Sequence, residues 1–320
     1  MLRSDRERQL SPRITIRAVI PHYFQESDQP VAEIGIGSGF GSRAHGGCFA
    51  RSLAFSRCLQ GLLNLRRAPQ DLLLDLRTAK ASRTPEPENK DAFISVDLEI
   101  IVVVQRGAFL VDVLTAFGPQ VQVLQHDLED PRNLGLTARD WLINHPAPAD
   151  LNLYLEDDLV IHDSLFAHKI LWMAHRSNQR CVLLPHRYEL TRRPGVAPRL
   201  FIDGPIDHEP FAEWHQPTIA VAHGDFRSDL NVQFDCPINP HAGCFGVTKH
   251  QLQIMSQREL PREGFVGPLE TAATYTVGRD FMVLKPTWIN REFLAIEHGH
   301  PSYLGYINPE CPPPAFADEP

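Results

Sequence analysis

The chain has 320 residues, 43% of them hydrophobic, and its 31 Lys and Arg against 39 Asp and Glu give a formal net charge of −8. This composition predicts a globular protein with a substantial core and excludes a largely disordered chain. The acidic balance argues against general nucleic-acid binding, which needs a basic surface. No apolar run is long enough to span a bilayer, and the charged start, MLRSDRERQLSPR, lacks the apolar stretch of a secretory signal. We therefore expect a cytoplasmic protein, with its six scattered cysteines reduced.

The first half of the chain alternates predicted strands with predicted helices. Strands are expected at 14–20, 96–104, 121–124, 149–161 and 181–185, and helices at 55–63, 108–117, 133–143 and 164–175. The polar, proline-containing segment 77–92 predicts an exposed connection. This alternation predicts an α/β fold with a mostly parallel central sheet flanked by helices.

A glycine-rich stretch, VAEIGIGSGFGS at 31–42, stands between the first strand and the first helix. An acid before Gly-x-Gly-x-Gly resembles the cofactor loop of class I methyltransferases, which would use Gly35–Gly41 to bind S-adenosylmethionine. That fold also wants an acid about 20 residues further on to hold the ribose hydroxyls. Between Glu33 and Asp71 there is no Asp or Glu. The other interpretation is a flexible loop whose glycines allow unusual backbone angles.

Three adjacent acids, Glu156, Asp157 and Asp158, follow the predicted strand LNLYL. In parallel α/β sheets, ligands bind beyond the carboxyl ends of the strands. Adjacent carboxylates repel one another unless solvent or a cation screens them. Mg²⁺ and Mn²⁺ prefer oxygen ligands, often one or two carboxylates together with substrate phosphates. The cluster therefore predicts either a metal-diphosphate site or a solvated acidic turn before the next helix.

With these acids in place, the chain resembles the GT-A glycosyltransferases, which hold a divalent cation on a nucleotide-sugar diphosphate with a DxD-type motif after a central strand. The opening VIPHYF and the order of NLGLTARDWLINHPAPADLNLYLEDD carry the resemblance, over residues 14–173. It implies a GT-A-like, Rossmann-type fold and transfer of a sugar, typically a hexose, from a UDP- or GDP-sugar to a small-molecule, glycan or protein acceptor. It also implies a divalent cation, Mn²⁺ or Mg²⁺.

The resemblance also implies roles for residues of the first half. Glu156 and Asp158 are the outer acids of the motif, with Asp158 on the metal and Glu156 bound to it through water or contacting the ribose. Asp157 takes the variable middle position. The remaining candidates would line the nucleotide pocket or approach the diphosphate: Pro21, His22, Tyr23, Phe24, Arg43 in the glycine-rich loop, and Arg139 on the helix before the motif.

Further roles are implied for the second half. A downstream histidine would complete the metal site, with His298 as the candidate ahead of His300. In an extended segment these two side chains would point to the same side. Glu270, after a Gly-Pro turn, would be the base of an inverting enzyme, or a carboxylate that stabilises a helix N-terminus. Residues 239–255 would pass beneath the donor sugar.

We expect one domain over 1–320, with a nucleotide-sugar-binding half at 14–173, an acceptor-facing and metal-completing half at 174–308, and a loosely ordered tail at 309–320. Two alternatives stay open: the methyltransferase, and a nucleotide-sugar-binding protein of the same fold that has lost catalysis. The sequence leaves the sugar, the acceptor, the stereochemical outcome and the oligomeric state open.

Overall fold

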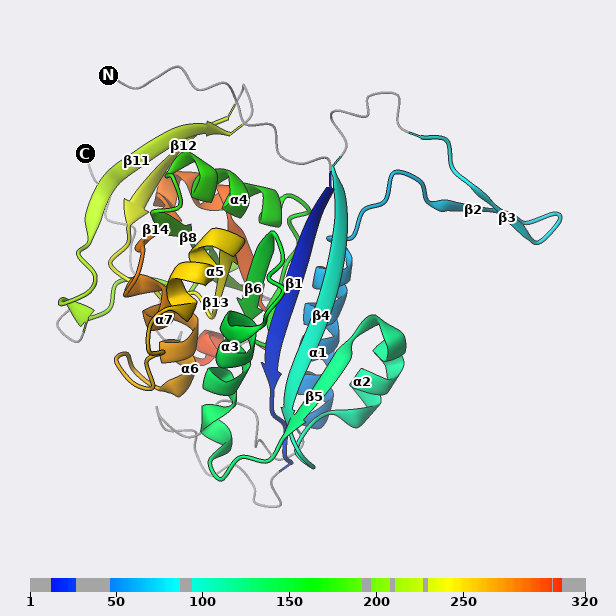
Figure 1. Cartoon of the computed structure of the whole chain (residues 1–320), viewed down its shortest axis with the longest axis horizontal. Helices are drawn as coiled ribbons and strands as arrows, with labels where there is room; N and C mark the ends of the chain where they lie inside the picture. The colour runs from blue at the N-terminus through cyan, green and yellow to red at the C-terminus, as the bar shows by residue number, and fades with distance from the viewer. Residues whose placement is uncertain are drawn as a thin grey trace.

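The structure, a computed structural model, describes residues 13–26, 47–86, 94–191, 197–207, 211–226, 230–300 and 302–306. Its central sheet has the strand order β13-β6-β1-β4-β5 (Figure 1). β1 pairs in parallel with β4 and β6, β4 pairs in parallel with β5, and only β13 is antiparallel, to β6. The predicted α/β fold with a mostly parallel sheet is therefore confirmed. The bounds are β1 Arg13–His22, β4 Ser95–Gln105, β5 Gln122–His126, β6 Leu151–Leu155 and β13 Cys244–Thr248.

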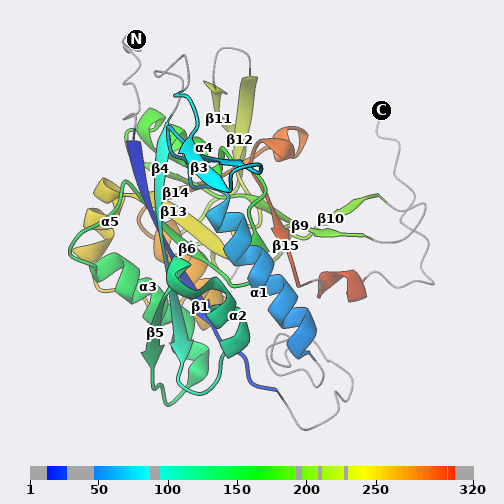
Figure 2. The ribbon, with the colours of Figure 1, turned by 90° about the vertical axis from the view of Figure 1, so that its right-hand side faces the viewer.

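Helices cover both faces of this sheet. α1 (Cys48–Leu63) and α2 (Val111–Phe117) lie on one face, and α3 (Leu134–Asn144) and α5 (Lys249–Ser256) on the other (Figures 1 and 2). Because both faces are covered, the second half of β4 is a continuous apolar run at 100–104, and the strand is buried from residue 100 to its end. The apolar helix face predicted from the sequence, Phe55, Cys58, Leu59, Leu62 and Leu63, faces the core. The first four of these residues have no exposed surface, and Leu63 is half-buried.

The second half of the chain adds two smaller sheets, β10-β9-β15-β7 and β11-β12-β14-β8. In the first of these, β15 is antiparallel to β7 and places His298 opposite Leu159, directly after the acidic cluster. The remaining bounds are β7 Leu159–Val160, α4 Phe166–Arg176, β8 Cys181–Leu183, β9 His186–Leu190, β10 Arg199–Phe201, β11 Thr218–Phe226, β12 Leu230–Cys236, α6 Pro268–Glu270, α7 Thr276–Gly278, β14 Met282–Pro286 and β15 Ala295–His298. Among the 3₁₀ and π segments, η5 (Thr271–Tyr275) joins α6 to α7, and η6 (Trp288–Phe293) and η7 (Tyr303–Tyr306) flank β15.

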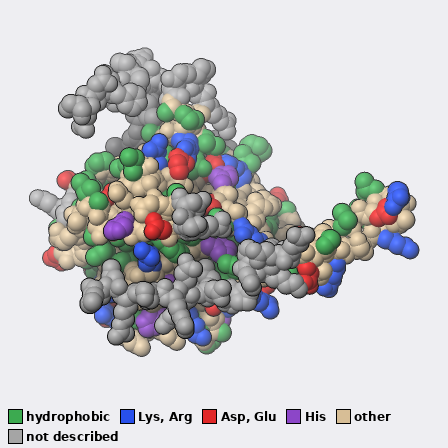
Figure 3. Space-filling view, turned by 90° about the horizontal axis from the view of Figure 1, so that it is seen from above, with side chains coloured by type: hydrophobic (Ala, Val, Ile, Leu, Met, Phe, Trp, Pro, Cys, Tyr) green, Lys and Arg blue, Asp and Glu red, His purple; other side chains and the backbone are tan. Residues whose placement is uncertain are grey.

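A hairpin of β2 (Leu72–Asp75) and β3 (Lys80–Arg83) projects from the body as an arm (Figures 1 and 3). Segment 77–92 is exposed where the structure describes it, as expected, but the hairpin itself was not predicted. Its strands bury no side chain, so they lack the one-sided apolar alternation by which strands are recognised. Within the described ranges, no helix is both long and apolar enough to cross a membrane.

Candidate functional site

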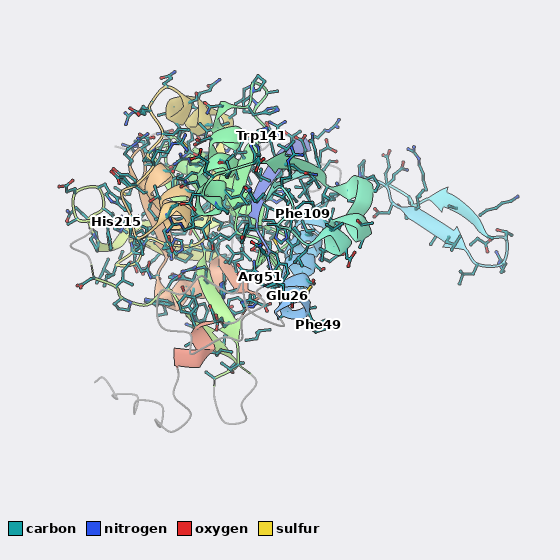
Figure 4. The ribbon with its side chains drawn as sticks, turned by 90° about the horizontal axis from the view of Figure 1, so that it is seen from below. Glu26, Phe49, Arg51, Phe109, Trp141 and His215 are labelled. Carbon is teal, nitrogen blue, oxygen red and sulfur yellow. The ribbon has the colours of Figure 1, made fainter. Side chains whose placement is uncertain are left out.

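The strand order of the central sheet fixes where a ligand can bind. Taken in chain order, the first four strands of this sheet are β1, β4, β5 and β6, and they lie in the order 3-2-1-4 that opens the Rossmann arrangement. The order reverses between β1 and β6, and ligands bind in the crevice beyond the carboxyl ends at such a switch point. His22 ends β1, and Glu156 directly follows β6. The acidic cluster therefore lies at the switch point, at the edge of the sheet seen from below in Figure 4.

Asp157 is held from two sides. His22 donates from Nδ1 to Asp157 Oδ2 at 2.6 Å, and Arg51 Nη2 donates to Oδ1 at 2.6 Å. His22 is fully buried and stacked on Phe55, and its Nε2 accepts the Leu110 N–H at 3.1 Å, which fixes the proton on Nδ1. Burial opposes ionisation of the Asp157 carboxyl, but the Arg51 charge and the His22 hydrogen bond outweigh it and hold the pKa well below its usual range. Asp157 is therefore an ionised anchor of the acidic segment.

Arg51 clamps the two aspartates together. It comes from the first turn of α1, on the side that faces the body, whereas Phe49 lies on the outer side (Figure 4). Its Nη1 donates to Asp158 Oδ2 at 3.0 Å, while Nη2 binds Asp157. Only 4% of Arg51 is exposed. The clamp offsets the repulsion between neighbouring carboxylates without using Asp158 Oδ1, which has no partner among the described residues.

Asp158 faces His298. The distance from Asp158 Oδ2 to His298 Nε2 is 3.6 Å, too long for a hydrogen bond. The other ring nitrogen, Nδ1, is bonded to Glu189 Oε1 at 2.9 Å. Glu189 is fully buried and also accepts the backbone N–H groups of residues 302–304, at 2.9, 3.0 and 2.7 Å. In the neutral ring this carboxylate keeps the proton on Nδ1, so Nε2 directs its lone pair toward Asp158.

This pair has the donor chemistry of a cation site. A carboxylate that orients a histidine from behind is the usual support of a histidine ligand. Two ligands about 2.1 Å from one ion lie roughly 3–4 Å apart, which matches the separation of Asp158 from His298. Within the described residues, no group of three or more His, Cys, Asp or Glu side chains is arranged to hold a metal. The pair therefore fits a cation whose other ligands come from substrate and water.

Glu156 points to a different part of the site. It is 9% exposed, and its Oε1 has no hydrogen-bond partner in the part of the chain that the structure describes. Burial raises the pKa of Glu156 to about 8, with Asp158 and Glu270 adding to the rise and Arg187 opposing it. Gly243 has a φ of +63°, and a Cβ there would lie 2.6 Å from Glu156 Oε2. The segment expected beneath the donor sugar thus packs against Glu156, and glycine permits the contact.

Glu270 lies at the start of a helical run made of α6, η5 and α7, within electrostatic range of Glu156. It is half-buried, and among the described residues it has no hydrogen bond or ion pair. Arg139 supports this run from α3. Its Nη1 donates to Thr276 Oγ1 at 2.9 Å and to Pro261 O at 2.6 Å.

Several residues that were expected to line the nucleotide pocket are buried or bound elsewhere in the structure. Arg139 was expected to approach a diphosphate, but it is fully buried with its donors bound to the protein. His22 was expected to line the pocket, but it lies behind Asp157. Of the remaining turn residues, Pro21 and Phe24 are buried, and only Tyr23 is half-exposed. Arg43 and the Gly35–Gly41 loop lie outside the described residues, and His300 is near Asp158, where burial lowers its pKa.

Three charged residues of the site escaped the sequence analysis: Arg51, Arg187 and Glu189. Arg51 belongs to no recognisable motif, and only its position in the helix after the glycine-rich loop distinguishes it from other arginines. Arg187 and Glu189 are two apart in HRYEL, and charges alternating with other residues in a short strand were an available signal.

The structure is thus an α/β protein with a cluster of acidic residues at the switch point of a mostly parallel sheet. No model of a protein family matches the chain, and no curated protein matches it. Among solved structures, 119 chains match. One is S. aureus TarS 1-349, with 11% identity over 85% of this chain and 58% of that one and a TM-score of 0.40. Another is TarS 1-349 in complex with UDP-GlcNAc, with 13% identity over 57% of this chain and 37% of that one and a TM-score of 0.29. The chain thus spans less than two thirds of either, and likeness at these scores assigns no function.

Proposed function

We propose that the protein transfers a sugar from a nucleotide-diphosphate sugar, a UDP- or GDP-sugar, with a divalent cation on the diphosphate. The observation that carries the proposal is the pair of Asp158 and His298 at the switch point, 3.6 Å apart, with His298 oriented by buried Glu189. A carboxylate and one imidazole leave most positions of a Mn²⁺ or Mg²⁺ ion for phosphate oxygens and water. Such a site binds the cation weakly alone and strongly with a diphosphate.

The chain's own residues divide the work of holding the donor. Asp158 and His298 would hold the cation, which when bound neutralises the charge that develops on the leaving diphosphate. His22 and Arg51 fix the direction of the acidic segment by holding Asp157. Glu156, with a free buried oxygen, would contact a hydroxyl of the donor sugar or ribose.

Glu270 is the proposed base. Its carboxylate has no partner among the described residues and stands near Glu156. In an inverting transfer it would accept the proton of the acceptor hydroxyl as that oxygen bonds to the anomeric carbon. The bond from this carbon to the diphosphate oxygen breaks, and its electron pair leaves with the diphosphate. The competing explanation is that the Glu270 carboxylate only stabilises the helix N-terminus at which it stands. Glu270→Gln separates the two explanations, because loss of a base lowers turnover while nucleotide binding remains.

The test is a thermal-shift panel of UDP, GDP, their common sugar conjugates and S-adenosylmethionine, each with Mn²⁺, Mg²⁺ or EDTA. A ligand at 100 times its dissociation constant stabilises the native state by about 2.7 kcal/mol. For a chain of this size that raises the melting temperature by roughly 5 °C. Asp158→Asn is the site variant. Asp127→Asn is its matched control, because Asp127 is an exposed acid directly after β5 at the same edge of the sheet.

The proposal expects a metal-dependent shift with one nucleotide family, lost in Asp158→Asn and kept in Asp127→Asn. A shift with S-adenosylmethionine in EDTA, and none with nucleotides, would replace it with the methyltransferase. Metal-dependent binding without turnover over a broad set of acceptors would favour a binding protein that has lost catalysis.

A further inference from the structure

Arg187 is a second positively charged side chain, besides Arg51, that faces the site; it lies on β9. Arg187 pairs across to Ile296 of β15, the strand that carries His298, and the two strands lie side by side in Figure 2. Side chains two apart in a strand point to the same face, so Arg187 shares its face with Glu189. Glu189 in turn holds His298. The strand pairing therefore directs the Arg187 guanidinium to the side where the acidic cluster lies.

Only one edge of this guanidinium is used by the protein. Arg187 Nε donates to Asp203 Oδ1 at 2.9 Å, and the Arg187 backbone N–H donates to Asp203 Oδ2 at 2.9 Å. Nη1 and Nη2 have no hydrogen-bond partner among the described residues, although Arg187 is only 4% exposed. Glu156 is close enough to interact electrostatically but forms no ion pair with it. The two free nitrogens form the fork that binds phosphate or carboxylate oxygens in pairs.

Arg187 shares its hydrogen-bonded carboxylate with a second buried cation. Asp203 also accepts a hydrogen bond from Lys285, whose Nζ donates to Oδ2 at 2.8 Å. Lys285 is fully buried, and Asp203 is 4% exposed. Two buried cations thus share one carboxylate. Among the described residues, Glu156 lies within electrostatic range of Arg187 but leaves both Nη atoms unbonded. Keeping a buried cation with unused donors is costly, so this cluster favours an oxyanion from outside the chain.

We propose that Arg187 binds an oxyanion of the donor, namely the diphosphate of the nucleotide sugar, beside the cation held by Asp158 and His298. Asp203 and Lys285 are positioning residues that fix the guanidinium with its Nη edge toward the ligand. This inference rests on the proposed function. A carboxylate on the transferred sugar is the other source of the same chemistry.

The test is calorimetric titration with UDP and GDP in Mn²⁺, and with UMP and GMP, for the wild type, Arg187→Met and Arg187→Lys. Loss of charge-assisted hydrogen bonds is expected to weaken diphosphate binding roughly 10- to 100-fold in Arg187→Met. Arg187→Lys keeps the charge and the option of pairing with Asp203, so it decides the question if the Met variant does not fold. Arg199→Lys is the control, because Arg199 lies on the neighbouring β10 and pairs with Glu292.

Support requires a loss for UDP or GDP in both folded variants, a smaller loss for the monophosphates, and none in Arg199→Lys. Wild-type affinity for the diphosphate in Arg187→Lys and Arg187→Met would overturn the inference and leave the proposed function standing. The same variants are also titrated with UDP-glucuronate and UDP-glucose in Mn²⁺. A loss confined to UDP-glucuronate, with UDP-glucose and UDP unchanged, would also overturn the inference and assign the fork to a sugar carboxylate. Failure of the wild type to bind any nucleoside diphosphate would instead refute the proposed function.

Discussion

Replacing Glu189 by Gln tests the support behind His298. The carboxylate accepts four hydrogen bonds: three at Oε1, from His298 Nδ1 and from two backbone N–H groups, and one at Oε2, from the Leu304 N–H at 2.7 Å. A glutamine oxygen at the Oε1 position keeps three of these bonds without the negative charge. Its NH₂ group then faces the Leu304 N–H, and because both groups are donors this hydrogen bond is lost.

The expected cost follows from these contacts. A hydrogen bond to a charged group is worth about 1.5–3 kcal/mol and a neutral one about 0.5–1.5, and an unsatisfied buried donor costs about 1–3 kcal/mol. Because the Leu304 bond is only part-buried, we take about 3 kcal/mol for the whole change. That lowers the melting temperature by roughly 6 °C in a chain of this size. Because the oxygen behind His298 no longer carries a negative charge, the histidine should also bind its cation about 10- to 100-fold more weakly.

Urea unfolding and thermal melting in EDTA measure the first effect without the cation, and Mn²⁺ titration in the presence of nucleoside diphosphate measures the second. Glu292→Gln is the control, because Glu292 makes an exposed pair with Arg199 that should contribute less than about 1 kcal/mol. If Glu189→Gln is no more destabilising than Glu292→Gln, the carboxylate does not hold residues 302–304 in place. If it lowers stability but leaves Mn²⁺ affinity unchanged, its role behind His298 is refuted.

Three further predictions concern stability. Burial and the nearby Lys285 charge lower the pKa of His186 to about 4. Between pH 6.5 and 4 the unfolded state therefore binds the proton more readily than the folded state, and acidification through this window should lower the free energy of unfolding by about 3 kcal/mol. Urea titrations should show a flatter loss in His186→Gln, and an unchanged pH profile would contradict the assignment. His22→Phe removes the acceptor of the Leu110 N–H and the donor to Asp157, and should destabilise by about 2–3 kcal/mol in urea; a change below about 0.5 kcal/mol would show that these bonds are not formed. Leu72→Ser, Leu73→Ser and Leu74→Ser combined should leave the melting temperature within about 1 °C of wild type, because all three side chains are more than half exposed; a large drop would mean that the arm packs against the body.

The central sheet and its helices could be predicted because their signals are local. The second half of β4, IIVVV at 100–104, is apolar because both faces are covered there, and the periodic residues of α1 are the ones that face the core. The position of the acidic cluster followed from the rule for carboxyl ends of parallel strands. His298 was expected near that cluster, and the pairing of β15 with β7 places it there.

The support of the site could not be predicted because it depends on pairings between distant segments. Glu189 reaches His298 only because β9 lies beside β15, and Arg51 meets Asp157 across 106 residues of chain. Arg139 has the spacing of the apolar face of α3, three residues after Leu136 and three before Leu142, but its charge suggested an exposed or ligand-facing side chain. In the structure α3 packs against the run that starts at Pro268 and buries it. From the sequence, His22 could have lined a pocket or been buried in the interior. It is buried, and its Nε2 accepts the Leu110 N–H, a contact that the sequence does not reveal.

The most direct test of the account is a count of bound Mn²⁺ by electron paramagnetic resonance, with and without UDP or GDP, in the wild type, Asp158→Asn and Asp127→Asn. We expect one tightly held Mn²⁺ per chain that appears only with the nucleoside diphosphate, because two protein ligands leave the remaining positions to phosphate and water. The signal should be lost in Asp158→Asn and retained in Asp127→Asn. Tight Mn²⁺ binding that is equal in both variants, or no Mn²⁺ bound with either nucleotide, would contradict a cation site at Asp158 and His298.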